Sequence, residues 1–115
     1  MYTGQWLEDN RTGNGTYVFY QGDTYYGGFK NGFLHGFGVY NQSNGNIYSG
    51  QWIEGKKSGN GTFIWANGDT YQGEFKNDYR DGFGIHNYSD GYVYSGQWVE
   101  GYPTGNGTFI WACLL

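Results

Sequence analysis

The sequence predicts an all-β fold: an elongated, single-layer antiparallel meander of five 23-residue β-hairpin repeats, with essentially no helix. A tyrosine recurs with a constant step of 23 residues, and each copy is followed by Gly two places on and by Trp or Phe four places on. The tyrosines are Tyr2, Tyr25, Tyr48, Tyr71 and Tyr94. A fixed period of this length is typical of repeat proteins, in which each unit buries its apolar face by stacking on its neighbours.

The first strand of each repeat begins at this tyrosine. In residues 2–8, Tyr2, Gly4 and Trp6 share one face because strand side chains alternate with a period of two. The position that follows the strand holds only Gly or Asp, at Asp9, Gly32, Gly55, Asp78 and Gly101. Gly adopts a left-handed backbone freely and Asp tolerates it better than most residues, so we expect the turn inside each repeat here.

The second strand begins at Gly13-Asn14-Gly15 and runs through Tyr17 and Phe19 in the first repeat. Gln21-Gly22 then turns the chain into the next copy, and the later copies place Asn-Gly or Asp-Gly there, at Asn44-Gly45, Asn67-Gly68 and Asp90-Gly91. Such pairs between alternating runs are a strong hairpin signal, and they predict type I′ turns in which both central residues have positive φ. Five hairpins joined in this way give a ten-stranded meander.

The repeats alternate in type, so the true period is 46 residues. Odd repeats carry Trp and Gly-Asn-Gly-Thr, whereas even repeats carry Phe and Gly-Phe-Gly. On the face opposite the tyrosines, odd repeats place aliphatic residues where even repeats place Lys and Asn, and even repeats add Phe37, Val39, Phe83 and Ile85. Both faces of a single sheet therefore carry apolar side chains. We expect part of this surface to contact another chain, or the tyrosine face to be covered by its own rings as the sheet twists.

Composition excludes several classes of protein. The chain of 115 residues is long enough for one domain, and it contains 23 Gly and 23% aromatic residues. Its net charge of −4 argues against nucleic acid as a partner. The only cysteine is Cys113, so no intrachain disulfide or cysteine-based zinc site can form. Neither a signal-peptide pattern nor a long apolar run is present. We expect a cytoplasmic protein without a cofactor or metal.

The motif Tyr-x-Gly-x-(Trp/Phe)-x-x-Gly-x-x-x-Gly-x-Gly on a 23-residue period resembles the MORN repeat (membrane occupation and recognition nexus). The resemblance covers the whole chain, with Asp9 and Asp78 in place of the turn glycine and Cys113-Leu114-Leu115 in place of the last Asn-Gly-Asp turn. It implies a twisted single-layer sheet without catalytic activity of its own. Relatives occur in cytoskeletal, ciliary and membrane-contact assemblies and beside enzyme domains, so it also implies association with a cytoskeleton or cilium.

The charges bear on an alternative function, phosphoinositide or membrane-surface binding. All six basic residues fall at or near the within-repeat turns and are expected to line one long edge: Arg11, Lys30, Lys56, Lys57, Lys76 and Arg80. The same edge carries six carboxylates, so its charge sums to zero. Because interleaved carboxylates cancel much of the attraction to anionic lipid, a mixed-charge edge in solvent is favoured, with weak or no direct membrane binding.

Catalytic constellations are missing from the sequence. His86 replaces the Tyr or Phe of the other repeats, which favours an aromatic filler of the sheet face over a base or ligand, and His35 lies in a turn. Gly36-Phe37-Gly38 opens no helix and is not a phosphate loop.

We therefore predict a non-catalytic scaffold or protein-interaction module that binds a helical or extended partner segment across its aromatic face. The predicted contact residues form one row on the first strands and its second-strand neighbours: Trp6, Phe29, Trp52, Phe75 and Trp98, with Phe19, Trp65, Tyr88 and Trp111. A further alternative is carbohydrate binding, in which the rings would stack on sugars. Unpaired terminal strands lead us to expect either a longer array or an edge-to-edge homodimer, or a larger assembly.

Overall fold

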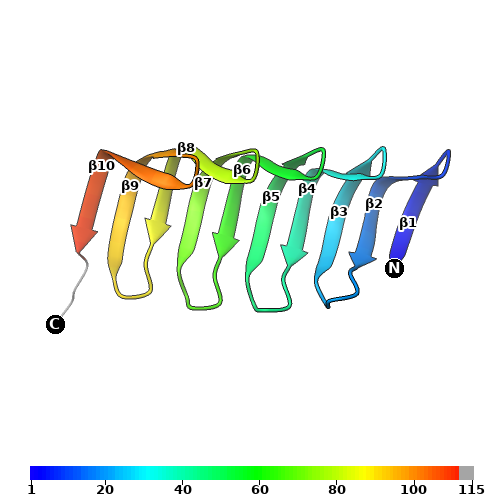
Figure 1. Ribbon diagram of the computed structural model, residues 1–115, viewed down its shortest axis with the longest axis horizontal. Helices are drawn as coiled ribbons and strands as arrows, with labels where there is room; N and C mark the ends of the chain where they lie inside the picture. The colour runs from blue at the N-terminus through cyan, green and yellow to red at the C-terminus, as the bar shows by residue number, and fades with distance from the viewer. Residues whose placement is uncertain (112–115) are drawn as a thin grey trace.

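The computed structural model describes residues 1–111 and shows one open sheet of ten antiparallel strands in sequence order, with no helix among them (Figure 1). This confirms the predicted meander of hairpins. The first strands of the repeats are β1 (Tyr2–Leu7), β3 (Thr24–Lys30), β5 (Ile47–Ile53), β7 (Thr70–Lys76) and β9 (Tyr92–Val99). The second strands are β2 (Asn10–Val18), β4 (Phe33–Asn41), β6 (Lys56–Ile64), β8 (Tyr79–Asn87) and β10 (Tyr102–Trp111). Cys113-Leu114-Leu115 lies outside the described residues.

The two kinds of turn differ from the prediction. The tight type I′ turn, with positive φ at both central residues, lies inside each repeat, as at Glu54 (49°) and Gly55 (83°). Between repeats, only the glycine has positive φ, as at Gly45 (102°), and Gln42 and Asn46 close a three-residue loop. This is a type I turn followed by a left-handed glycine. The prediction of type I′ turns at the Asn-Gly and Asp-Gly pairs was therefore wrong, because the pairs occupy the last two places of a three-residue loop.

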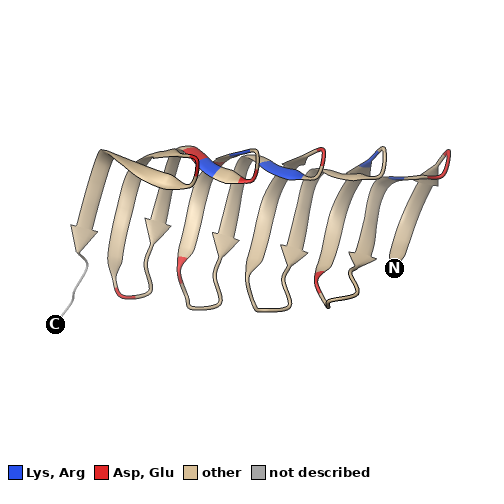
Figure 2. Cartoon of the chain, in the orientation of Figure 1, with Lys and Arg blue, Asp and Glu red and all other residues tan. Residues whose placement is uncertain are grey.

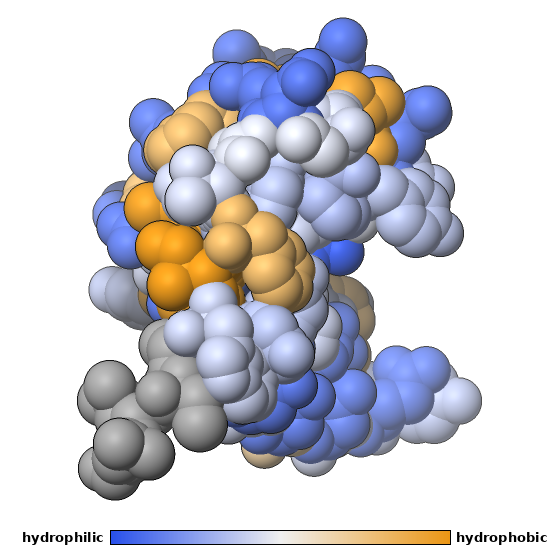
Figure 3. All heavy atoms as spheres, turned by 90° about the vertical axis from the view of Figure 1, so that its left-hand side faces the viewer, coloured by the Kyte–Doolittle hydropathy of each residue, from blue (hydrophilic) through white to orange (hydrophobic). Residues whose placement is uncertain are grey.

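A bulge in every hairpin bends the sheet across its strands. In the second hairpin Gly27 pairs with Gly38 and Phe29 with Leu34, so three residues of β4 lie opposite one residue of β3. One of the three, Gly36, has a φ of 77°. Bulges of this kind bend the strand that carries them. Viewed end-on, the molecule has a C-shaped profile that is hollow on one side (Figure 3). We call this concave side the trough and the opposite side the outer face.

The core is a herringbone of aromatic rings on the floor of the trough. Each repeat tyrosine packs edge-on against the Trp or Phe of its own strand, and those of repeats one to four also pack against that of the next repeat. Tyr48, for example, lies 5.1 Å from Trp52 at 86° and 5.1 Å from Phe75 at 84°. Edge-to-face pairs add stabilisation beyond area burial. The hydroxyl of Tyr48 donates to the carbonyl of Gln51 at 2.9 Å, which satisfies its polar end.

Hydrogen bonds link neighbouring repeats at both long edges. At the within-repeat turns, the amide of Gly55 donates to the carbonyl of Leu34. At the other edge, the side chain of Asp23 accepts from the amide of Ser43 at 2.9 Å, and Asp69 accepts from Ser89 at 2.8 Å. These edge bonds and the ring core add to the backbone ladders that pair each repeat with the next, such as β4 with β5.

No helix in the described part of the chain is long and apolar enough to cross a membrane.

Candidate binding trough

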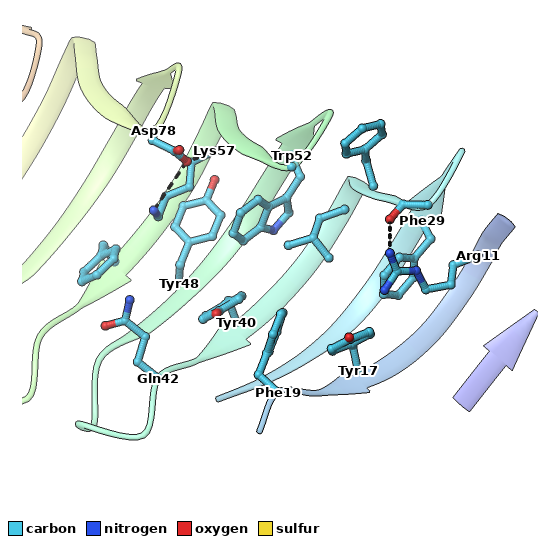
Figure 4. A pocket seen from close by; sticks show the side chains of 15 residues that line it. Arg11, Tyr17, Phe19, Phe29, Tyr40, Gln42, Tyr48, Trp52, Lys57 and Asp78 are labelled. Carbon is cyan, nitrogen blue, oxygen red and sulfur yellow. Dashed lines mark hydrogen bonds and ion pairs between the residues drawn. The ribbon is translucent and has the colours of Figure 1, made fainter. Parts of the chain in front are cut away.

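A hollow of the trough with a volume of about 450 Å³ extends over the first three repeats and reaches Asp78. Figure 4 shows its rings: Tyr48 and Trp52 form part of the floor, and Phe19, Tyr17 and Tyr40 stand along the side nearer the between-repeat turns. Floor and side differ in burial, because the first-strand rings are buried whereas the second-strand rings are half-buried. A partner in the trough would therefore contact mainly the second-strand rings, because the first-strand rings of the floor are buried beneath them.

The predicted contact residues fall into three groups. Phe29, Trp52, Phe75 and Trp98 are each 5% exposed or less, so they form the core and offer almost no surface to a partner. This agrees with the second interpretation of this row, in which the sheet covers its own rings. Phe19, Trp65 and Tyr88 are half-buried along the side of the trough, and Trp6 and Trp111 on the outermost strands are 58% and 51% exposed. A contact role for these five residues stays a prediction.

The structure also places three cations inside the trough, which corrects the expectation that all six line an edge. Figure 2 shows Lys and Arg only along the edge of the within-repeat turns, but Arg11, Lys57 and Arg80 turn inwards over the rings. The guanidinium of Arg80 lies 4.3 Å from the ring centre of Trp98, and that of Arg11 lies 4.9 Å from Tyr17. Lys30, Lys56 and Lys76 remain exposed.

A sequence signal for these inward cations existed. Their position in the repeat is taken by Leu34 and Pro103 in the other two copies, and apolar residues there indicate an inward-facing site. Arg11 donates to the carbonyl of Gly32 at 2.8 Å and Arg80 to that of Gly101 at 2.6 Å, so each guanidinium caps the turn of the following repeat. Arginine suits this position because it stacks on rings and donates several hydrogen bonds at once.

The side of the trough nearer the between-repeat turns holds a buried histidine, His86, that is 3% exposed. Its ring stacks on Tyr88 at 4.1 Å, its Nδ1 lies 2.9 Å from Arg80 Nη1 and its Nε2 lies 3.1 Å from Asp69 Oδ2. Because arginine can only donate, Nδ1 must accept, and the ring is neutral with its proton on Nε2. Tyr40 occupies the same position in repeat two, where its hydroxyl donates to Asp23 at 2.9 Å. This supports the prediction of His86 as an aromatic filler.

We expect the stability of the protein to fall as the pH drops below about 6.5, the ordinary pKa of histidine. Burial lowers the pKa of His86, the hydrogen bond to Asp69 opposes this effect, and the charge of Arg80 lowers the pKa further. The unfolded chain then binds a proton that the folded chain does not, so unfolding is favoured between the ordinary pKa and the lowered one. Urea midpoints measured from pH 8 to pH 5 test this.

The matched control is His86→Tyr, which restores the ring of repeat two and keeps a hydroxyl donor for Asp69. His35 is retained in both proteins, so the difference between their pH profiles isolates His86. We expect the variant to lose less stability than the wild type over this range. Parallel profiles would contradict the neutral, lowered-pKa state of His86.

Within residues 1–111, no group of three or more His, Cys, Asp or Glu is placed to hold a metal ion. The pKa of Asp69 is lowered: burial raises it, but the hydrogen bonds from Ser89 and His86 outweigh that effect. Burial raises the pKa of Tyr40 to about 12, with a further contribution from Asp23. These side chains are held in fixed hydrogen bonds of the sheet, which suits a structural role.

Comparison with known proteins agrees with this architecture. The family model described as "MORN repeat" matches five times, over residues 2–24, 25–47, 48–70, 71–91 and 94–112. No curated protein matches the chain. The MORN repeat is a non-catalytic module that is in general involved in interactions with proteins or membranes. Since the five matches cover nearly the whole sequence in register with the five hairpins, the chain belongs to the MORN-repeat family.

Proposed function

We propose that the chain is a non-catalytic interaction module whose trough binds a helical or extended segment of a partner protein. The observation that carries the proposal is the row of half-buried rings along one side of the trough. Phe19, Trp65 and Tyr88 occupy the same place in repeats one, three and four, and Gln42 takes that place in repeat two. Half-buried aromatic rings in a groove are the usual anchors for an apolar face of a bound segment.

The charges define the chemistry of the segment further. Of the three inward cations, only Lys57 has a carboxylate close by within the described residues, with Nζ 3.7 Å from Asp78 Oδ1. Arg11 and Arg80 use some of their donors on backbone carbonyls, and guanidinium groups have five donors each. A segment that combines apolar anchors with Asp or Glu side chains therefore complements the trough best. A cytoskeletal, ciliary or membrane-contact assembly in the cytoplasm is the setting that we propose for it.

Selection from a phage library of random 16-residue peptides on the whole chain tests this proposal. The selected peptides are synthesised and titrated against wild type and Trp65→Ala. We expect them to be rich in aromatic, aliphatic and acidic residues, and to lose at least about tenfold in affinity on Trp65→Ala, as for a typical hot-spot ring. Arg11→Gln should weaken peptides with carboxylates more than peptides without them.

Ile64→Ala is the matched control, because Ile64 precedes Trp65 in the chain and faces the outer face with 40% exposure. It should change affinity by less than about twofold, within the range of residues outside a hot spot. Circular dichroism of both variants confirms that the sheet is retained. Equal losses for the two variants, or selected peptides that bind both with unchanged affinity, would contradict binding in the trough.

Vesicles that contain phosphatidylinositol 4,5-bisphosphate, at physiological salt, test the membrane alternative. Pelleting that Trp65→Ala or Arg11→Gln abolishes, combined with failure of the peptide selection, would favour the membrane surface over a protein segment.

A further inference from the structure

The outer face alternates between projecting and recessed repeats. Repeat two projects Tyr26 and Phe37, which are 62% and 57% exposed, and repeat four projects Phe83 at 46%. Repeat three is recessed in the middle of its strands, whereas Ile53 and Ile64 nearer the strand ends are exposed. Ser49, Gln51, Asn60 and Thr62 line this hollow over the paired glycines Gly50 and Gly61, and Phe37 and Phe83 form its two ends. We call Phe37 and Phe83 the knobs and the hollow over repeat three the central hollow.

The spacing of these features makes the face complementary to itself. Knobs and recesses alternate at every repeat, which is two strands or about 10 Å along the sheet. Two copies can stack outer face to outer face about a two-fold axis that runs parallel to the strands and passes between repeats two and three. This symmetry places repeat n of one copy against repeat 5 − n of the other. Repeat two then faces repeat three, and repeat one faces repeat four, so every knob meets a recess. An isologous contact of this kind closes after two copies.

We propose that this chain forms a two-fold dimer through its outer faces, with Phe37 of each copy seated in the central hollow of the other. Phe83 of each copy then lies over repeat one, whose outer face carries the small polar side chains of Thr3, Asn14 and Thr16. The dimer is independent of the trough and of its partner, because the trough lies on the opposite side of the sheet (Figure 3).

The available area is comparable with that of a standard dimer interface. The molecule measures 55 × 25 × 17 Å, and the proposed register overlaps four of the five repeats. The overlapping area is about 1,100 Å² per copy, and about half of that if curvature limits contact to the middle of the strands. A standard interface buries roughly 800 Å² per partner. The knobs and the central hollow lie at the middle of the strands, where two convex faces touch first.

The middle of the outer face also carries little charge. Its rows, defined by the strand register, hold Ser, Thr, Asn and Gln together with Tyr26, Val39, Ile85 and the two knobs, with Glu74 as the carboxylate among them. Glu74 Oε2 accepts from the amide of Phe83 at 3.0 Å, and the register places it against Asn14 and Thr16 of the other copy. No like charges meet across the two-fold axis in these rows, so apolar contact is not opposed by repulsion there.

Sedimentation equilibrium of the whole chain between about 1 and 200 µM, a range that covers weak and standard dimers, tests the proposal. The monomer mass is 13.0 kDa, and we expect twice that mass at the upper end of the range. Phe37→Asp combined with Phe83→Asp should return the mass to that of the monomer. The control Tyr20→Asp changes a side chain that is 95% exposed beside a between-repeat turn, and should leave the dimer intact.

A cross-linking experiment tests the register while keeping the knobs. In a Cys113→Ser background, Tyr26→Cys and Thr62→Cys proteins are mixed and oxidised. The two positions lie in one row across the sheet, on β3 and β6, and the proposed register places them against each other. The mixed disulfide should dominate over the Tyr26→Cys homodimer, which a register with repeat two against repeat two would favour.

A monomer at every concentration would overturn the proposal and leave the outer face for another chain. A dimer that survives both aspartates, or a dominant Tyr26→Cys homodimer, would overturn it as well. Circular dichroism and urea unfolding of the aspartate double variant serve as the check on folding.

Discussion

Replacing Trp52 with alanine should destabilise the fold by about 3 to 5 kcal/mol, the usual cost of deleting a buried large aromatic side chain. The ring is 5% exposed, and it packs edge-on against Tyr48 at 5.1 Å and Tyr25 at 5.6 Å. Its Nε1 donates to the carbonyl of Gly38 at 3.3 Å, so the variant also leaves a buried acceptor without its donor. Because small domains are stable by only about 5 to 15 kcal/mol, this loss removes a large part of the free energy of unfolding. Urea unfolding followed by circular dichroism measures the loss.

Trp6 provides a matched control, since it holds the same place in repeat one. It is 58% exposed and contacts Tyr2 at 5.0 Å, with no hairpin before it in the described chain. Trp6→Ala should cost about 1 kcal/mol, in the range of partly exposed apolar residues. Equal losses for the two substitutions would contradict the assignment of Trp52 to the core. The comparison also shows why Trp52→Ala is a poor test of partner binding: it removes the floor of the sheet and not only a contact.

The strand order and the face of each tyrosine could be predicted from the sequence because they depend on local signals repeated five times. Alternation fixes which side chains share a face, and turn residues fix where the chain reverses. The turn type between repeats was missed for a physical reason: Asn-Gly occurs both as the two central residues of a type I′ turn and as the end of a three-residue loop. Only the hydrogen bonds that close the loop distinguish the two.

The candidate site was predicted less well, because burial depends on how neighbouring repeats stack. Trp52 and Trp65 both follow the inward pattern, but the structure buries the first and leaves the second half-buried. The inward direction of Arg11, Lys57 and Arg80 follows from their pairing with the ring residues of the first strands, as Lys57 pairs with Trp52. Leu34 and Pro103 at the same position of the repeat signalled this direction, whereas the charges alone indicated only the edge.

Gly61→Ala should destabilise the protein by about 2 to 3 kcal/mol, although its φ does not lie in the left-handed region. A Cβ on Gly61 would lie 2.6 Å from Cε1 and 2.7 Å from Cζ of Tyr48. That ring cannot move aside cheaply, because it is 2% exposed and packs between Trp52 and Phe75. Gly61 is required for the close approach of the ring to the backbone and not for a turn. Thermal and urea unfolding measure the loss.

Two other glycines separate crowding from backbone strain. At Gly36 a Cβ would meet nothing within 4 Å but φ is 77°, so Gly36→Ala should cost only about 1 kcal/mol through left-handed strain. Gly15 lies under Tyr2 as Gly61 lies under Tyr48, with a Cβ 2.7 Å from Cζ of Tyr2. Because β1 is held by β2 alone and Tyr2 is less buried, Gly15→Ala should cost less than Gly61→Ala.

The first hairpin also permits a double-mutant cycle. In the central repeat, the same cycle would remove a buried core ring and unfold the protein. If crowding by the ring is the cause, Gly15→Ala should cost almost nothing in a Tyr2→Ala background, because the atoms that it would overlap are gone. An undiminished cost in that background would show that the glycine serves the backbone instead. The glycine would then recur in every repeat because the strand pairing requires it, and the rings would pack over it only because the space is free.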